Sequence, residues 1–158
     1  MQVKLTDKAK ELQKVLGVSF LPTRQSKGDA GYDLRACIET PIKVYPRQIE
    51  KIPTGVHVWL GDIDIEVRHL ISFCGFYLPR SGTKGLQLAN SIGLLDSSYQ
   101  GESFLKVINV SEAPIYIEPG ERIAQLVIQA CFIAPLEEVL DFDIETGRGE
   151  GDGSSGRI

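Results

Sequence analysis

Residues 93–102, Gly-Leu-Leu-Asp-Ser-Ser-Tyr-Gln-Gly-Glu, carry side chains that could do chemistry on a nucleotide. Tyr99 follows Asp96 by three positions, and Gly101 comes two positions after the ring. This pattern is typical of a β-hairpin whose tip holds a carboxylate and an aromatic ring close together. A carboxylate can act as a general base and a ring can pack under a flat sugar, so the segment could form a nucleotide pocket. The alternative is a solvent-exposed turn, because Asp and Ser are common turn residues.

Two other segments carry groups that bind phosphate. Residues 79–82, Pro-Arg-Ser-Gly, place a guanidinium, a hydroxyl and an amide in one loop, although this is also an ordinary turn after a strand. Residues 146–158 are rich in Gly, Ser and charge, and their glycines and arginines could wrap a polyphosphate. The same composition is typical of a disordered chain end, so both interpretations stay open for each segment.

Length, charge and cysteine content limit the classes of protein to consider. The 158 residues fit one domain, and 42% hydrophobic with 24% charged residues is ordinary for a soluble globular protein. The net charge of −4 argues against a nucleic-acid partner, but a few arginines, backbone amides and a metal can still hold a small phosphorylated ligand. Cys37, Cys74 and Cys131 form no C-x-x-C pair, which argues against zinc and for free thiols in a reducing compartment. Without a signal peptide or a membrane-spanning apolar run, we expect a cytoplasmic protein with no membrane partner.

Short apolar or alternating runs cover most of the chain and predict strands. Good turn sequences separate them, among them Tyr-Pro-Arg-Gln, Pro-Thr-Gly and Glu-Pro-Gly-Glu. Many short strands at such spacing indicate an all-β barrel or sandwich. The expected strands cover residues 1–5, 42–45, 48–52, 56–60, 63–67, 70–78, 104–110, 113–117 and 122–133.

One short amphipathic helix is expected near the N-terminus, at residues 6–16. Thr6 is a suitable N-cap, and Ala9, Leu12 and Leu16 share one face before Gly17 ends the pattern.

Five segments occur together in one order and resemble the five motifs of the homotrimeric deoxyuridine triphosphatase (dUTPase) family. The resemblance extends from about Phe20 to the C-terminus, and five motifs in sequence make it specific. The segments are Ala-Gly-Tyr-Asp-Leu-Arg-Ala at 30–36, Pro-Arg-Ser-Gly at 79–82, the 93–101 segment, Gly-Glu-Arg-Ile-Ala-Gln-Leu at 120–126, and the glycine-rich 148–156.

The resemblance implies an all-β, jelly-roll type barrel, three copies of which form a homotrimer with three shared active sites. The implied reaction is hydrolysis of dUTP to dUMP and pyrophosphate, with Mg²⁺ on the triphosphate. Asp96 corresponds to the general base that activates water for attack on the α-phosphorus, and Tyr99 to the ring that excludes a 2′-hydroxyl. Asp33 corresponds to a residue that acts near the metal through water, while the substrate phosphates mainly hold Mg²⁺.

The same resemblance implies the remaining substrate contacts. Asn90 and the backbone of the 93–102 segment would read uracil, and residues 79–82 would bind phosphate. Residues 1–145 would form the barrel domain, with 146–158 a flexible tail that closes over an active site. The implied substrate-binding residues are Arg80, Ser81, Gly82, Asn90, Gly93, Leu94, Leu95, Tyr99, Gln125, Arg148, Ser154 and Ser155. Structural alternatives stay open for two side chains. Asp33 could be a buried structural carboxylate paired with Arg35 or with a turn amide, and Gln125 could merely satisfy a backbone group.

Three features depart from the family pattern. The last motif has no aromatic residue between its glycines, residues 55–78 form a long segment, and the helix at 6–16 is an addition. Either addition could bind a protein partner or cover a neighbouring subunit. Two other functions stay open: a dCTP deaminase with the same barrel, which would need a catalytic glutamate, and a non-catalytic nucleotide-binding regulatory trimer.

Overall fold

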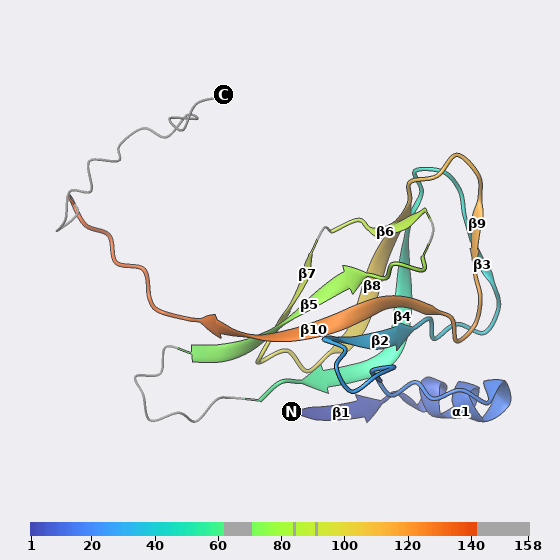
Figure 1. Ribbon diagram of the computed structural model, residues 1–158, viewed down its shortest axis with the longest axis horizontal. Helices are drawn as coiled ribbons and strands as arrows, with labels where there is room; N and C mark the ends of the chain where they lie inside the picture. The colour runs from blue at the N-terminus through green and yellow to red at the C-terminus, as the bar shows by residue number, and fades with distance from the viewer. Residues whose placement is uncertain (62–70, 84, 91, 142–158) are drawn as a thin grey trace.

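The computed structural model describes residues 1–61, 71–83, 85–90 and 92–141, which form ten strands and one helix (Figure 1). The strand predicted at 63–67 and the tail 146–158 lie outside the described residues. The elements are β1 (Gln2–Leu5), α1 (Asp7–Leu16), β2 (Gly31–Arg35), β3 (Ile42–Val44), β4 (Ile49–Trp59), β5 (Ile71–Pro79), β6 (Leu86–Leu88), β7 (Gly93–Asp96), β8 (Glu102–Asn109), β9 (Ile115–Ile117) and β10 (Arg122–Phe132).

Two four-stranded antiparallel sheets make up the body of the molecule. One sheet has the strand order β1-β4-β8-β6 and the other the order β2-β10-β5-β7. The pair β3-β9 forms a separate ribbon that extends beside them at one end (Figure 1). The predicted all-β class is confirmed, and the architecture is of the jelly-roll type.

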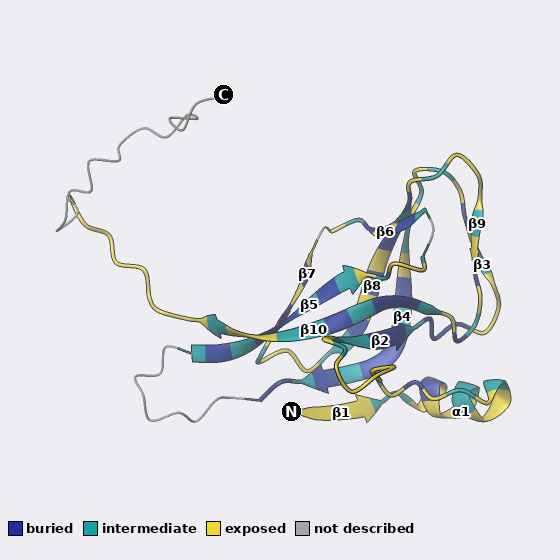
Figure 2. Cartoon of the chain, viewed as in Figure 1, coloured by how far each residue is buried: buried dark blue, intermediate teal, exposed yellow. Residues whose placement is uncertain are grey.

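The hydrophobic core fills the space between the two sheets. Alternate residues of β8, including Leu105 and Val107, are fully buried while their neighbours face outward, as the period of a strand requires. Leu34 and Leu126 contribute to the core from the opposite sheet. Figure 2 shows buried positions concentrated in the central strands and an exposed β1.

The two strands predicted at 48–52 and 56–60 are one continuous strand, β4, so the turn predicted at 53–55 is wrong. The pairing of β4 with β8 shifts between Pro53 and His57, which identifies a β-bulge. Gly55 has a φ of +71° there, a conformation that glycine adopts without strain. The same residue types occur in bulges and in turns. Only the pairing of β4 with β8 shows that residues 53–55 form a bulge.

The predicted N-terminal helix is confirmed as α1. The Thr6 hydroxyl accepts a hydrogen bond from the Ala9 N–H at 3.1 Å, and Gly17 ends the helix in the left-handed conformation. Ala9 is fully buried against the bulge: a Cβ at Gly55 would lie 2.6 Å from its Cβ and 2.7 Å from Cys37 Sγ. The apolar face of α1 therefore packs on the chain's own barrel. Within the described residues, no helix is long and apolar enough to cross a membrane.

Candidate functional site

Residues 93–102 connect the two sheets. β7 pairs with β5, whereas β8 pairs with β4 and β6, so the predicted hairpin is wrong. The side chain of Leu95 is only 2% exposed and fills the core, which commits β7 to the sheet of β5. The turn between the strands is nevertheless tight, because the Tyr99 N–H donates to the Asp96 carbonyl at 3.1 Å. Asp96 and Tyr99 are therefore close together, as the spacing predicts.

A hollow of about 390 Å³ lies beside β7, and we call it the β7 hollow. Asp96 and Tyr99 are exposed in it, while the buried Leu95 can offer a ligand only its backbone groups. β7 is an edge strand of its sheet, so one of its two backbone edges has no partner among the strands that the structure describes. Six predicted site residues line this hollow together: Asn90, Gly93, Leu94, Leu95, Asp96 and Tyr99.

The Tyr99 ring is held from two sides. Its hydroxyl donates to the Glu102 carbonyl at 3.0 Å. The ring lies directly over Gly101, where an added Cβ would come within 2.5 Å of Tyr99 Cζ. Only glycine leaves room for the ring in this position.

Lys51, Tyr77 and Phe104 are among the lining residues of the β7 hollow that escape prediction from the sequence. Tyr77 shares a hydrogen bond of 2.6 Å with the Ser103 hydroxyl, and burial raises the pKa of its phenol. Each of the three comes from a different strand, at an ordinary strand position. No local motif marks them, and only the pairing of β4, β5 and β8 brings them to the hollow.

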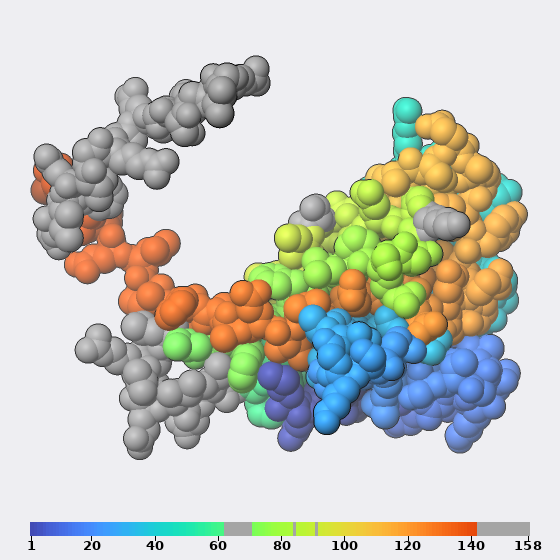
Figure 3. Space-filling view, in the orientation of Figure 1, coloured from blue at the N-terminus to red at the C-terminus, as the bar shows by residue number. Residues whose placement is uncertain are grey.

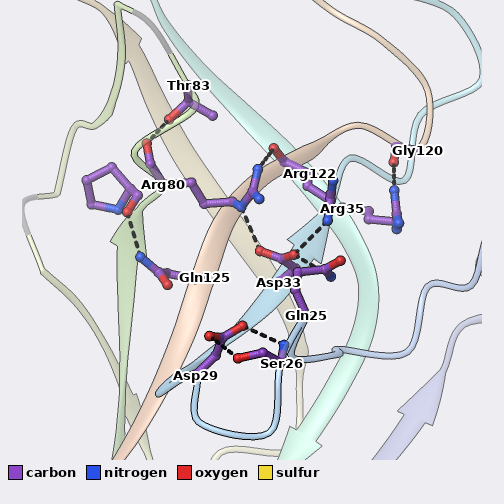
Figure 4. Close-up of polar contacts among 11 residues, drawn as sticks. Gln25, Ser26, Asp29, Asp33, Arg35, Arg80, Thr83, Gly120, Arg122 and Gln125 are labelled. Carbon is purple, nitrogen blue, oxygen red and sulfur yellow. Dashed lines mark hydrogen bonds and ion pairs between the residues drawn. The ribbon is translucent and has the colours of Figure 1, made fainter.

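A second hollow of about 390 Å³ is lined by Asp33 of β2, and we call it the Asp33 hollow. Figure 4 shows the polar contacts around Asp33. Asp33 Oδ1 accepts from Arg80 Nε at 2.6 Å, and Oδ2 accepts from Arg122 at 3.2 Å. Gln25 Nε2 also donates to Oδ2, at 2.9 Å. Arg35, the structural partner considered from the sequence, instead donates to the Gly120 carbonyl at 2.6 Å. Asp33 therefore orients guanidinium groups that come from β10 and from the end of β5.

Gln125 lines the same hollow and also satisfies a backbone group. Its Nε2 donates to the Pro79 carbonyl at 3.1 Å. The side chain crowds Gly31 on the neighbouring strand, where an added Cβ would lie 2.9 Å from Gln125 Cδ. Ser81 and Gly82 follow Arg80 in an exposed loop, and Ser81 also lines the hollow. The structure thus brings together the first, second and fourth motifs.

The donor groups of the described residues do not form a protein cage for a metal. They include no group of three or more His, Cys, Asp or Glu side chains placed to hold an ion. Both carboxylate oxygens of Asp33 already accept hydrogen bonds from cations or amides.

Asp96 of the β7 hollow and Arg80 of the Asp33 hollow are far apart within one chain. Asp96 lies opposite Cys74 in the β5–β7 register, and Arg80, the residue after the end of β5, follows Cys74 by six positions. At about 3.3 Å per strand residue, the separation along the sheet is about 20 Å.

Residues 133–141 leave the body of the molecule after β10 (Figure 3). Leu136 and Leu140 are fully exposed there, at 101% and 104% of their reference areas. Arg148, Ser154 and Ser155, predicted to contact substrate, lie outside the described residues.

The chain is a small antiparallel β-barrel of the jelly-roll type. One of its hollows holds a carboxylate and an aromatic ring, and the other holds the ion pair of Asp33 with Arg80, a combination suited to phosphorylated ligands. The model of the family described as dUTPase matches residues 19–156. The chain belongs to the dUTPase family, which confirms the resemblance seen in its motifs.

Curated relatives match along most of the chain. The deoxyuridine 5′-triphosphate nucleotidohydrolase of Idiomarina loihiensis is 43% identical over 141 residues, which cover 87% of each chain. That of Acinetobacter baumannii is 39% identical over 155 residues, which cover 96% of this chain and 93% of the relative.

Solved dUTPase structures share the fold of this chain. The Staphylococcus bacteriophage 80alpha dUTPase with dUPNHPP superposes with a TM-score of 0.77 at 25% identity, over 99% of this chain and 98% of that one. A mutant dUTPase from phage phi11 of S. aureus has a TM-score of 0.68 at 22% identity, over 90% and 98% of the two chains. The latter structure is described as coordinating a structural Mg(II) ion.

Proposed function

We propose that this protein hydrolyses dUTP to dUMP and pyrophosphate, the activity for which its curated relatives are named. The observation that carries the proposal is the pair of complementary hollows. The β7 hollow offers an exposed carboxylate, a fixed aromatic ring and strand-edge backbone groups. The Asp33 hollow offers the guanidinium group that a triphosphate needs.

In the β7 hollow, Asp96 would take the proton of the water that attacks the α-phosphorus. Tyr99 would lie against the deoxyribose and leave no space for a 2′-hydroxyl. Asn90 and the backbone of β7 would pair with the edge of uracil, since fixed donors and acceptors discriminate better than an amide that can flip.

In the Asp33 hollow, Arg80, Ser81, Gly82 and Gln125 would bind the β- and γ-phosphates. The ion pair with Asp33 at 2.6 Å fixes the direction of the Arg80 guanidinium before substrate arrives, which reduces the entropy lost on binding. Mg²⁺ bound to the triphosphate would neutralise part of its charge. Asp33 would act near that ion only through water, because its oxygens are engaged by protein groups.

The separation of about 20 Å between Asp96 and Arg80 of one chain exceeds what the triphosphate of one nucleotide can bridge. A complete site therefore needs the β7 hollow of one subunit beside the Asp33 hollow of another, as in a homotrimer with three shared sites. The exposed apolar residues Leu136 and Leu140 support such an assembly, because packing on a neighbour would remove them from water. The tail would add Arg148, Ser154 and Ser155 to the triphosphate as it closes.

Gly101→Ala is expected to lower the preference for dUTP over UTP about tenfold. The new methyl group would displace the Tyr99 ring from its place over Gly101, and the ring could no longer exclude the 2′-hydroxyl. The measurement is kcat/KM for both nucleotides, with Gly28→Ala as a control because a Cβ there meets nothing within 4 Å. An unchanged ratio in Gly101→Ala would contradict the assigned role of the ring.

Pyrophosphate release from dUTP, dCTP and dTTP in the presence of Mg²⁺ tests the proposed function. We expect release from dUTP alone. Formation of dUTP from dCTP would instead indicate a deaminase, and tight dUTP binding without turnover would indicate a regulatory protein.

A further inference from the structure

Lys51 on β4 is a cation at the β7 hollow that belongs to none of the five motifs. It occupies an outward, exposed position of the strand. Its Nζ lies 3.9 Å from the centroid of the Phe104 ring, which is itself 37% exposed and lines the same hollow. The contact with the ring face holds the ammonium at the hollow instead of letting it move freely in solvent.

A second lysine lies directly across the sheet. Lys51 and Lys106 are paired residues in the register of β4 and β8. Like charges directly opposite one another destabilise a sheet, so the pair is unfavourable for folding alone. None of the ion pairs among the described residues involves either lysine. In a chain of net charge −4, this is a local concentration of positive charge that an anion would stabilise.

The charged side chains that line the β7 hollow show how a phosphate group would be held there. Asp96 and Glu102 line the hollow and both repel phosphate, whereas Lys51 is the one cation among the described residues that line it. Arg80 and Arg122 of the same chain are bound to Asp33 in the other hollow. A nucleotide whose α-phosphorus lies beside Asp96 would therefore gain a favourable charge interaction with Lys51 on this side of the site.

We propose that Lys51, whose ammonium lies over the Phe104 ring, binds the α-phosphate of the nucleotide in the β7 hollow. This inference rests on the proposed function, since it places a deoxyuridine nucleotide there. Lys51 would contact the phosphate from the subunit that holds the nucleoside, whereas Arg80 would reach the phosphates from a neighbouring subunit. Lys106 raises the local potential without lining the hollow.

The test compares the affinities of dUMP and deoxyuridine, which differ only in the phosphate, by equilibrium titration of the whole chain. In Lys51→Met, we expect dUMP to bind about tenfold more weakly and deoxyuridine to bind as in the wild type. Methionine can stay over the ring without a charge, so packing on Phe104 is kept. Lys51→Arg is expected to retain most of the dUMP affinity.

Lys43→Met is the matched control. Lys43 Nζ also lies over an aromatic ring, 4.7 Å from the centroid of Tyr45, but on the β3–β9 ribbon. We expect its affinities for both ligands to be unchanged. Equal loss of dUMP and deoxyuridine affinity in Lys51→Met, or no loss of either, would overturn the inference while wild-type dUTP hydrolysis stands. A wild type that neither binds nor hydrolyses deoxyuridine nucleotides would overturn the proposed function and the inference together.

Discussion

Asp96→Asn is expected to lower kcat for dUTP about a thousandfold without weakening the binding of dUMP. Asparagine has nearly the shape of aspartate but cannot accept the proton of the attacking water. Asp96 is exposed in the β7 hollow, so the substitution buries no unpaired group. The Asp96 carbonyl, which accepts from the Tyr99 N–H, is unaffected by a side-chain change, so the turn keeps its shape.

Steady-state pyrophosphate release gives kcat, and titration with dUMP reports whether the hollow is intact. Asp141→Asn is a suitable control, because this exposed residue follows β10 and lies outside both hollows. If Asp96→Asn retained more than about a tenth of wild-type turnover, another group would have to serve as the base.

Arg80→Ala is expected to lower kcat/KM for dUTP about a hundredfold and to leave the affinity for dUMP unchanged. The guanidinium would contact the β- and γ-phosphates, which dUMP lacks. Asp33 keeps its hydrogen bonds from Arg122 and Gln25 in the variant, so the β2–β10 region should still fold.

Arg80→Lys and Asp33→Asn distinguish the contribution of the positive charge at position 80 from that of the fixed orientation of the Arg80 guanidinium. Lysine keeps the charge but not the planar fork, so we expect a loss smaller than that of Arg80→Ala. Asp33→Asn keeps the guanidinium but removes the carboxylate that holds Nε at 2.6 Å, and it should also give an intermediate loss. Equal reductions in dUMP and dUTP affinity in Arg80→Ala would show that Arg80 supports the fold rather than the triphosphate.

Local sequence patterns predict the helix and the strands whose ends and faces are set by residues close together in the sequence. Thr6 and Gly17 bound α1 because a cap and a left-handed glycine act within a few residues. The alternation of buried and exposed residues predicts β5, β8 and β10 within a few positions of their observed ends. The three-residue strand β6 carries no comparable signal.

Errors in the prediction arise where a distant partner decides the outcome. A glycine near Pro53 predicts a turn, but pairing with β8 makes a bulge at Gly55. The 93–102 segment looks like a hairpin, yet β7 pairs with β5.

The polar contacts of the site show the same dependence. Arg35 is the nearest cation to Asp33 in sequence, whereas the arginines that bind Asp33 lie 47 and 89 positions away. Lys51 and Phe104 reach the β7 hollow from different strands for the same reason.

Mixed trimers of Asp96→Asn and Arg80→Ala subunits test whether one active site takes Asp96 and Arg80 from different copies of the chain. The variants are coexpressed with different affinity tags, and trimers that carry both tags are purified. In a closed ring of three, every mixed trimer then contains one site with both residues intact, so we predict recovery of about a third of wild-type dUTP turnover. Turnover no greater than that of the separate variants, in trimers shown to contain both subunits, would contradict the shared site.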